Sequence, residues 1–112
     1  MQVNWKEEFS AAITVCDKNG TILEMNDKSA KAFSDEGGYK LIGKNLFDCH
    51  SPDSVYKIKE LLLENKTNVY TIEKNGKKKL IYQSPWSENG EINGLVEFSI
   101  EIPPDMPHFI RS

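Results

Sequence analysis

The sequence predicts a single α+β domain in which an antiparallel sheet of about five strands carries its helices on one face. Asn-Gly dipeptides at 19–20, 75–76 and 89–90 stand between segments rich in β-forming residues. This dipeptide favours tight hairpins because both residues tolerate positive φ. Apolar residues at helical spacing within 52–62 predict a helix between the first hairpin and the last three strands.

Length and composition restrict the classes of protein. The 112 residues suit one domain, and the fractions of 38% hydrophobic and 28% charged residues are ordinary for a globular one. The formal net charge of −3 argues against a nucleic-acid-binding protein, which normally presents a basic face. No apolar run is long enough to span a membrane, and the N-terminus has no signal-peptide pattern. We therefore expect a cytoplasmic protein with neither nucleic-acid nor membrane partners.

The N-terminus predicts a short cap helix over residues 4–10. Asn4 is a suitable N-cap residue, and Glu7 three positions later completes a capping box. Trp5 and Phe9 lie four residues apart and share one face of such a helix. Because exposed aromatic pairs usually mark an interface, we expect both residues to contact a second copy in a homodimer. Covering the sheet of their own subunit is the alternative.

The predicted core spans residues 11–102 and opens with a hairpin. Residues 12–16 and 21–25 alternate as strands do, with a turn at 17–20 between them. Asn26 is placed to cap the helix that follows.

The middle of the core predicts short helical turns over residues 37–50 and then the longest helix. Ser51 is its N-cap and Pro52 its first residue, and Asp53 complements the positive helix end.

The last third predicts three strands and ends in a Pro-rich tail, residues 103–112, which cannot continue a strand. The final strand alternates between two sets of residues, which predicts one packed and one wet face. The apolar set is Val96, Phe98, Ile100 and Ile102, and the polar set is Glu97, Ser99 and Glu101. Apolar residues occupy both alternate sets of the preceding strand, so the sequence leaves open which set faces inward.

Three segments stand in a recurring order across residues 9–102: Asp17-x-x-Gly20-x-Ile22-x-x-x-Asn26, Leu41-Ile42-Gly43-Lys44 and Cys49-His50-Ser51-Pro52. In order and spacing they resemble a PAS domain, and the last of them is similar to a bacterial PAS subgroup with a Cys-His-Pro-Pro stretch. The resemblance implies a sheet of strand order 2-1-5-4-3 and a cavity between sheet and helices. It also implies a sensory or signalling module, which holds haem, flavin, a small metabolite or nothing.

This resemblance predicts a ligand pocket between the sheet and the helices, lined mostly by apolar side chains. Its candidate residues are Ile13, Val15, Met25, Phe33, Leu46, His50, Val55, Ile58, Leu62, Ile81 and Phe98.

The residues at a few positions bear on which cofactors the domain could hold. His50 is the candidate haem ligand, although a histidine next to a helix cap is more often structural. The resemblance does not imply flavin photochemistry, since Leu46 stands where that branch of the family has its reactive cysteine. A phenolate chromophore would lack its partners, because Met25 and Ser29 stand where tyrosine and glutamate hold it. The Cys49 thiol is a candidate redox group, and no spacing indicates a metal site.

The interpretation is therefore a signalling module and not an enzyme. It binds a small molecule or a protein partner, and it forms a homodimer. The alternatives are a ligand-free docking scaffold and a small isomerase- or hydratase-like enzyme of the cone-shaped α+β kind with one acid in its pocket.

Overall fold

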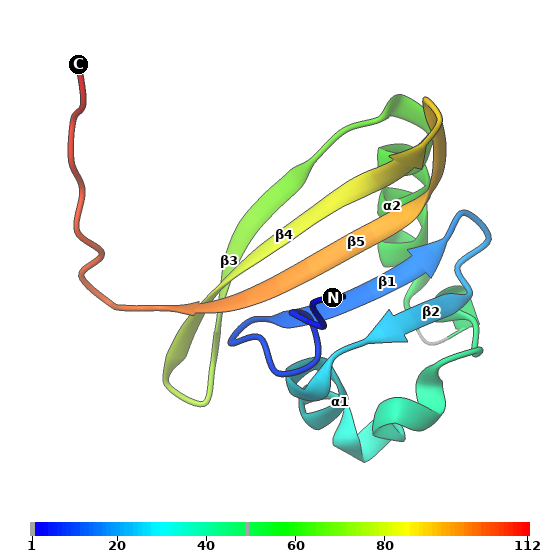
Figure 1. Cartoon of the computed structure of the whole chain (residues 1–112), viewed down its shortest axis with the longest axis horizontal. Coiled ribbons are helices and arrows are strands. Elements are labelled where there is room, and N and C mark those ends of the chain that lie inside the picture. The colour runs from blue at the N-terminus through cyan, green and yellow to red at the C-terminus, as the bar shows by residue number, and fades with distance from the viewer. Residues whose placement is uncertain (1, 49) are drawn as a thin grey trace.

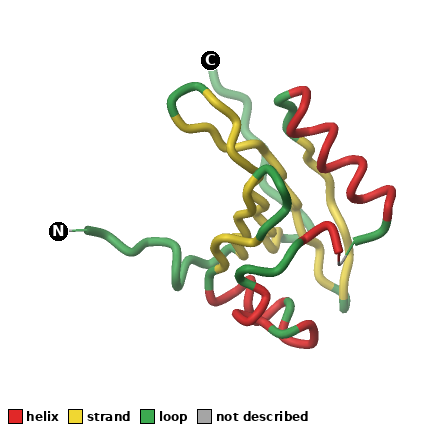
Figure 2. Tube along the Cα trace, turned by 90° about the vertical axis from the view of Figure 1, so that its right-hand side faces the viewer, coloured by secondary structure: helices red, strands yellow, loops and turns green. Residues whose placement is uncertain are grey.

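The computed structural model describes residues 2–48 and 50–112. Within them, one five-stranded antiparallel sheet has the order β2-β1-β5-β4-β3, as the resemblance implied. Figure 1 shows α2 behind the sheet and α1 beside its β2 edge, and Figure 2 shows the same arrangement from the side. The strands are β1 (Ala12–Asp17), β2 (Ile22–Met25), β3 (Asn68–Lys74), β4 (Lys77–Glu88) and β5 (Glu91–Ile102), and the α-helices are α1 (Asp27–Ala32) and α2 (Pro52–Glu64).

The segment between α1 and α2 consists of short helical turns, as the irregular pattern predicted. These are the 3-10 helices η1 (Ser34–Glu36), η2 (Gly38–Leu41) and η3 (Leu46–Asp48). An isolated β-bridge between Thr21 and Asn45 ties this segment to the start of β2. The segment thereby forms a wall opposite the sheet.

Two of the three Asn-Gly turns adopt the conformation that the sequence predicts. Asn75 and Gly76 have φ values of 54° and 76°, and Asn89 and the glycine after it have 55° and 81°. Positive φ at both central residues defines the turn type that suits a right-twisted hairpin. The first hairpin differs, because only Gly20 has positive φ there and the Asp17 carboxylate holds the turn by accepting from two backbone N–H groups.

Both α-helices begin where their caps predicted. The Asn26 side chain accepts from the Ser29 N–H, and the Ser51 hydroxyl accepts from the Ser54 N–H. Pro52 occupies the first turn of α2, where its missing N–H costs nothing. Asn65, in the left-handed region, ends α2.

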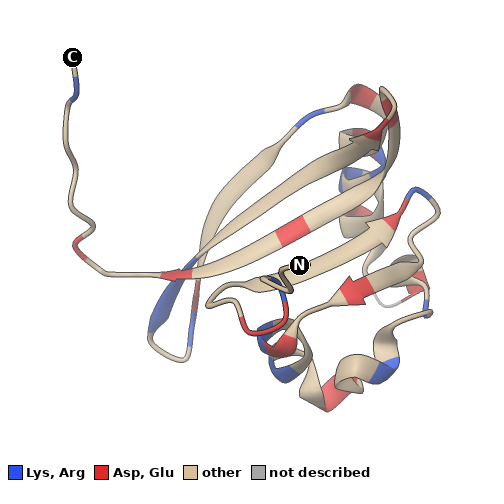
Figure 3. Cartoon of the chain, in the orientation of Figure 1, with Lys and Arg blue, Asp and Glu red and all other residues tan. Residues whose placement is uncertain are grey.

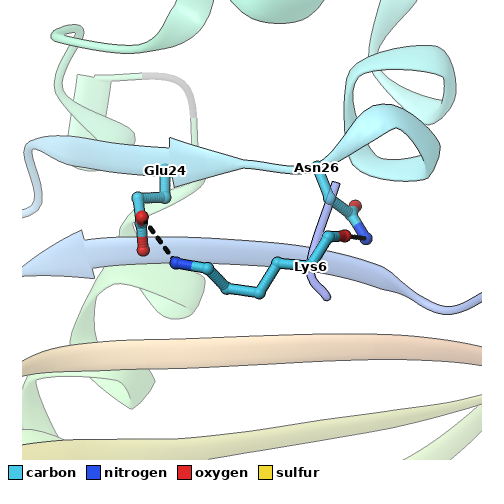
Figure 4. A network of polar contacts seen from close by, with 3 residues as sticks. All are labelled: Lys6, Glu24 and Asn26. Atoms are coloured by element: carbon cyan, nitrogen blue, oxygen red, sulfur yellow. Dashed lines mark hydrogen bonds and ion pairs between the residues drawn. The ribbon is translucent and has the colours of Figure 1, made fainter. Parts of the chain in front are cut away.

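The predicted cap helix at 4–10 is not formed. That stretch makes a single turn, in which the Phe9 N–H donates to the Lys6 carbonyl. Asn26 explains the difference, because its amide donates to the Lys6 carbonyl at 3.0 Å and Lys6 also pairs with Glu24 at 2.7 Å (Figure 4). These tertiary bonds hold the segment against the end of β2 and outweigh the weak preference of so short a helix.

Cross-strand pairing determines which residues share a face of the sheet. Cys16 pairs with Leu95 across β1 and β5, and both pack against Ile58 and Leu61 of α2. We call this the inner face. The alternate set forms the outer face, directed away from the helices. Its apolar members include Ile13, Val15, Val69, Leu80, Tyr82, Trp86, Val96, Phe98, Ile100 and Ile102.

The apolar set of the final strand was predicted as its packed side, and it faces away from the helices. Glu97, expected on the wet side, pairs with Thr14 and Gln83 on the inner face. Alternation specifies which residues share a face but not which face meets the helices.

The buried core on the inner face has two parts. One is the cluster of Cys16, Leu95 and the α2 stripe. The other consists of Ile22, Met25 and Leu41. Leu46 packs against both, and the candidate site lies between them.

Candidate functional site

A cavity of about 260 Å³ lies between the inner face and the segment that joins α1 to α2. Its volume is that of about nine water molecules in the liquid, which is small beside the cavities of about 300–1,000 Å³ that hold drug-sized ligands. The lining residues are Thr14, Cys16, Ile22, Met25, Phe33, Glu36, Leu41, Leu46, His50, Leu95 and Glu97.

Glu97 is the charged group on the sheet side of this cavity. It is half-buried on β5, and the Gln83 amide donates to its Oε2 at 3.2 Å. The Asn68 amide donates in turn to the Gln83 carbonyl oxygen at 3.0 Å. This chain from β3 through β4 to β5 holds the Gln83 amide group in one orientation and the carboxylate in one place.

The negative charge of Glu97 affects two neighbouring groups. Burial raises the pKa of the Tyr70 phenol, and the charge of Glu97 raises it further. Burial also raises the pKa of the Cys16 thiol, with the carboxylates of Asp17 and Glu97 adding to the rise. Cys16 is only 2% exposed, so it contributes a neutral, weakly polar thiol to the cavity wall.

Ser29 and Thr14 join the helix to the sheet beside the cavity. Their hydroxyls share a hydrogen bond, and Ser29 is fully buried at the start of α1. The Thr14 hydroxyl is therefore already engaged when a ligand arrives.

Three exposed residues of the lining, Phe33, Glu36 and His50, lie at the mouth of the cavity. The Nδ1 of His50 lies 2.9 Å from the Leu46 carbonyl oxygen. A carbonyl oxygen only accepts, so Nδ1 is the donor, and in the neutral ring Nε2 remains an acceptor. The mouth thus adds further acceptor groups to the site.

The structure separates the predicted pocket residues into three groups. Met25, Phe33, Leu46 and His50 line the cavity together. The second group lies on the helix side of the sheet but outside the cavity lining: Ile58 and Ile81 are buried, and Val55 and Leu62 are half-buried.

The third group lies on the wrong side of the sheet for this cavity. Ile13, Val15 and Phe98 belong to the outer face, because they occupy the strand positions that alternate with Thr14, Cys16 and Glu97. The pocket prediction relied on their apolar character, which marks a covered face and does not say what covers it.

Sequence reasoning missed the cavity residues that β1 and β5 contribute. Thr14, Leu95 and Glu97 alternate with the apolar residues that were placed inside. The available signal was Glu97 itself, a charged residue in the middle of a long strand flanked by two other strands. Ile22, Glu36 and Leu41 were also missed because they come from short, irregular elements.

Haem does not fit this cavity. The cavity is small, and its two charged lining residues, Glu36 and Glu97, are acids that would repel the carboxylates of a haem. Among residues 2–48 and 50–112, no group of three or more His, Cys, Asp and Glu side chains forms a candidate metal site. The predicted redox residue Cys49 lies outside the described residues.

The outer face is a second candidate surface. Val69, Tyr82 and Ile100 are exposed there despite being large and apolar. Trp5 and Phe9 of the N-terminal segment stack edge to face at 5.5 Å, and they are 52% and 43% exposed. The aromatic pair predicted from the sequence therefore exists without the helix that was expected to present it.

Comparison with solved structures identifies the fold. A C-terminal domain from Streptococcus mutans aligns with a TM-score of 0.71 and 22% identity, covering 88% of this chain and 80% of that one. The PAS domain of the histidine kinase ThkA aligns with a TM-score of 0.67 and 17% identity, covering 80% of this chain and 97% of that one. The Aer2 receptor from Vibrio cholerae is a dual PAS-heme oxygen sensor. It aligns with a TM-score of 0.64 and 14% identity, covering 83% of this chain and 95% of that one.

The chain therefore has the PAS fold, as its motifs indicated. No protein-family model and no curated protein matches it, so membership of the subgroup with the Cys-His-Pro-like stretch stays a prediction. No helix in the described part of the chain is long and apolar enough to cross a membrane.

Proposed function

We propose that this chain is a sensory domain that binds a small molecule in the cavity beside Glu97. The observation that carries the proposal is the carboxylate itself, held by Gln83 against an otherwise largely apolar wall. A domain that needed only a stable core would be better served by an apolar residue there, because a half-buried charge costs free energy unless something binds it. The sensory kinase and receptor domains of the same fold support this role.

The proposed output surface is the outer face, covered by a second copy of the chain. Glu97 faces the cavity while its neighbours Val96 and Phe98 face outward on the same strand. A ligand that shifts the β5 backbone at Glu97 would also shift Val96 and Phe98, because the three residues are consecutive on one strand. A homodimer through this surface would convert binding into a change of subunit arrangement.

A ligand-free docking scaffold is the second candidate function, and the outer face favours it. Such a scaffold would use the same apolar surface for a protein partner and need no occupied cavity. The small-enzyme alternative, with one acid in its pocket, would use Glu97 as that acid, but the described residues place no second acid–base side chain in hydrogen-bond contact with it.

Native mass spectrometry of freshly purified protein, with no ligand added, distinguishes these functions. We expect a dimer that retains a small mass, well below that of haem. Leu46→Trp, which fills the cavity, should lose the retained mass, while Leu63→Trp on the exposed side of α2 should keep it. A bare species in all three samples, still dimeric, would contradict the sensor and favour the scaffold.

A further inference from the structure

The polar groups that line the cavity offer hydrogen-bond acceptors and almost no free donors. Glu97 and Glu36 contribute carboxylates, which only accept when ionised. His50 uses its Nδ1 hydrogen on the Leu46 carbonyl, so its other ring nitrogen is an acceptor in the neutral ring. The Thr14 and Ser29 hydroxyls share one hydrogen bond, which occupies one of their two hydroxyl hydrogens. A ligand that satisfies this lining must bring donors of its own.

No cation of the chain neutralises Glu97 in the described structure. Its carboxylate belongs to none of the ion pairs among residues 2–48 and 50–112, and no Lys or Arg lines the cavity. Figure 3 shows no basic position along the middle of β4 and β5, and the sequence of β5 contains no Lys or Arg at all. A carboxylate in partly dry surroundings is stabilised most by a cation, and here that cation must come from outside the chain.

The negative charge of Glu97 acts on two neighbouring groups. It adds to the rise in the pKa of both the Tyr70 phenol and the Cys16 thiol, which lie on different strands.

The apolar part of the cavity lining indicates what the rest of the ligand is like. It consists mainly of aliphatic and thioether side chains, those of Ile22, Met25, Leu41, Leu46 and Leu95. The cavity volume of about 260 Å³ leaves room for roughly nine non-hydrogen atoms if each takes the volume of a water molecule.

We propose that the cavity selects small organic monocations, in which an apolar body of this size carries a protonated amine that pairs with Glu97. The apolar body displaces water from the aliphatic walls, and the ammonium donates to the Glu97 carboxylate that Gln83 orients. This inference rests on the proposed small-molecule function and adds the charge of the ligand to it.

Three probes of nearly equal shape test the charge directly: phenethylamine, 2-phenylethanol and phenylacetate. Each is titrated into ¹⁵N-labelled protein while the amide signals of Thr14, Cys16 and Leu95 are followed. We expect the amine to bind more tightly than the alcohol and the carboxylate to bind least. Glu97→Gln should lower the affinity for phenethylamine roughly 10- to 100-fold, the range for a hydrogen bond to a charged group. The affinity for 2-phenylethanol should stay nearly unchanged.

The matched control is Glu101→Gln, which makes the same charge change on the same strand outside the cavity. It should leave the affinity for phenethylamine as in the unmodified chain. Circular dichroism of each variant verifies the fold. If the amine and the alcohol bind equally, or Glu97→Gln binds the amine undiminished, the charge selectivity is overturned while a small-molecule site remains. If none of the three probes shifts these signals, the cation site is overturned as well.

Discussion

The indole Nε1 of Trp86 donates a 2.9 Å hydrogen bond to the carbonyl oxygen of Cys16, and it does so across the backbone of Gly94. A Cβ on residue 94 would lie 1.9 Å from that carbonyl oxygen and 2.5 Å from the indole nitrogen. The central strand β5 thus needs a residue without a side chain at position 94, so that the Trp86 indole of β4 can reach the Cys16 carbonyl oxygen of β1. This contact links the outer face to the backbone of a cavity residue.

We expect Gly94→Ala to destabilise the protein by about 3 kcal/mol or more, because the closest atom belongs to a backbone that cannot move aside cheaply. Urea unfolding measures the loss. Trp86→Phe should cost about 1 kcal/mol through the lost hydrogen bond. The double variant should regain little of the Gly94→Ala loss, and full recovery would show that the indole alone caused the clash.

The second prediction is a large loss of stability when Asn26 is replaced. Its side chain is almost fully buried, accepts from the Ile13 and Ser29 N–H groups, and donates to the Lys6 and Ala11 carbonyl oxygens. Asn26→Asp keeps the two accepted bonds but places a carboxylate against two carbonyl oxygens. We expect a loss of about 2–4 kcal/mol in the free energy of unfolding, since one oxygen of the buried carboxylate would face two carbonyl oxygens and no donor.

Hydrogen exchange locates the consequence of Asn26→Asp. The Asp27 N–H donates to the Glu7 carbonyl at 2.9 Å, and this bond should lose protection first as the N-terminal segment detaches. Asn19→Asp, in the exposed first turn, is the matched control and should change stability little. Equal losses in the two variants would contradict the role assigned to Asn26.

The third prediction concerns pH. The hydrogen bond that Tyr39 donates to the Asp27 carboxylate raises the pKa of the phenol to about 12, because it stabilises the neutral form. We expect Asp27→Asn to lower the pKa of Tyr39 toward 10, measured by ultraviolet titration of phenolate and assigned with Tyr39→Phe.

The sign of the linked stability follows from this raised pKa. The folded protein holds the phenol proton more tightly than the unfolded chain, so the contribution is fully present below about pH 10 and is lost as the pH rises toward 12. Denaturant unfolding across this range should show a smaller alkaline loss for Tyr39→Phe than for the unmodified chain. An unchanged Tyr39 titration in Asp27→Asn would refute the pairing.

The proposed dimer through the outer face gives a fourth prediction. Ile100→Lys places a charge on this face and should raise the dimer dissociation constant at least about tenfold, the effect of losing a well-packed interface residue. Leu63→Lys introduces the same side chain on α2, where residue 63 is 87% exposed, and should leave the constant unchanged. Sedimentation over a range of concentrations compares the two, and equal effects would exclude the outer face as the interface.

Most of the fold could be predicted because its determinants are local. The turn dipeptides, the Asn26 and Ser51 caps and the Pro52 helix start each act within a few residues, and the structure retains them. The candidate site was predicted only in part. Met25, Phe33, Leu46 and His50 were placed at the cavity, whereas Glu97 was placed in solvent.

By itself the sequence determined the kinds of element, their order and the sets of residues that share a strand face, because period and turn chemistry are properties of neighbouring residues. Only the tertiary structure decided that the polar set of β5 meets the helices and that the residues at 4–10 follow bonds to Asn26 in place of a helix. The physical reason is that both outcomes depend on contacts between residues far apart in the chain. Alternation alone leaves two equivalent ways to turn a strand, and a helix of seven residues is too weak to resist such contacts.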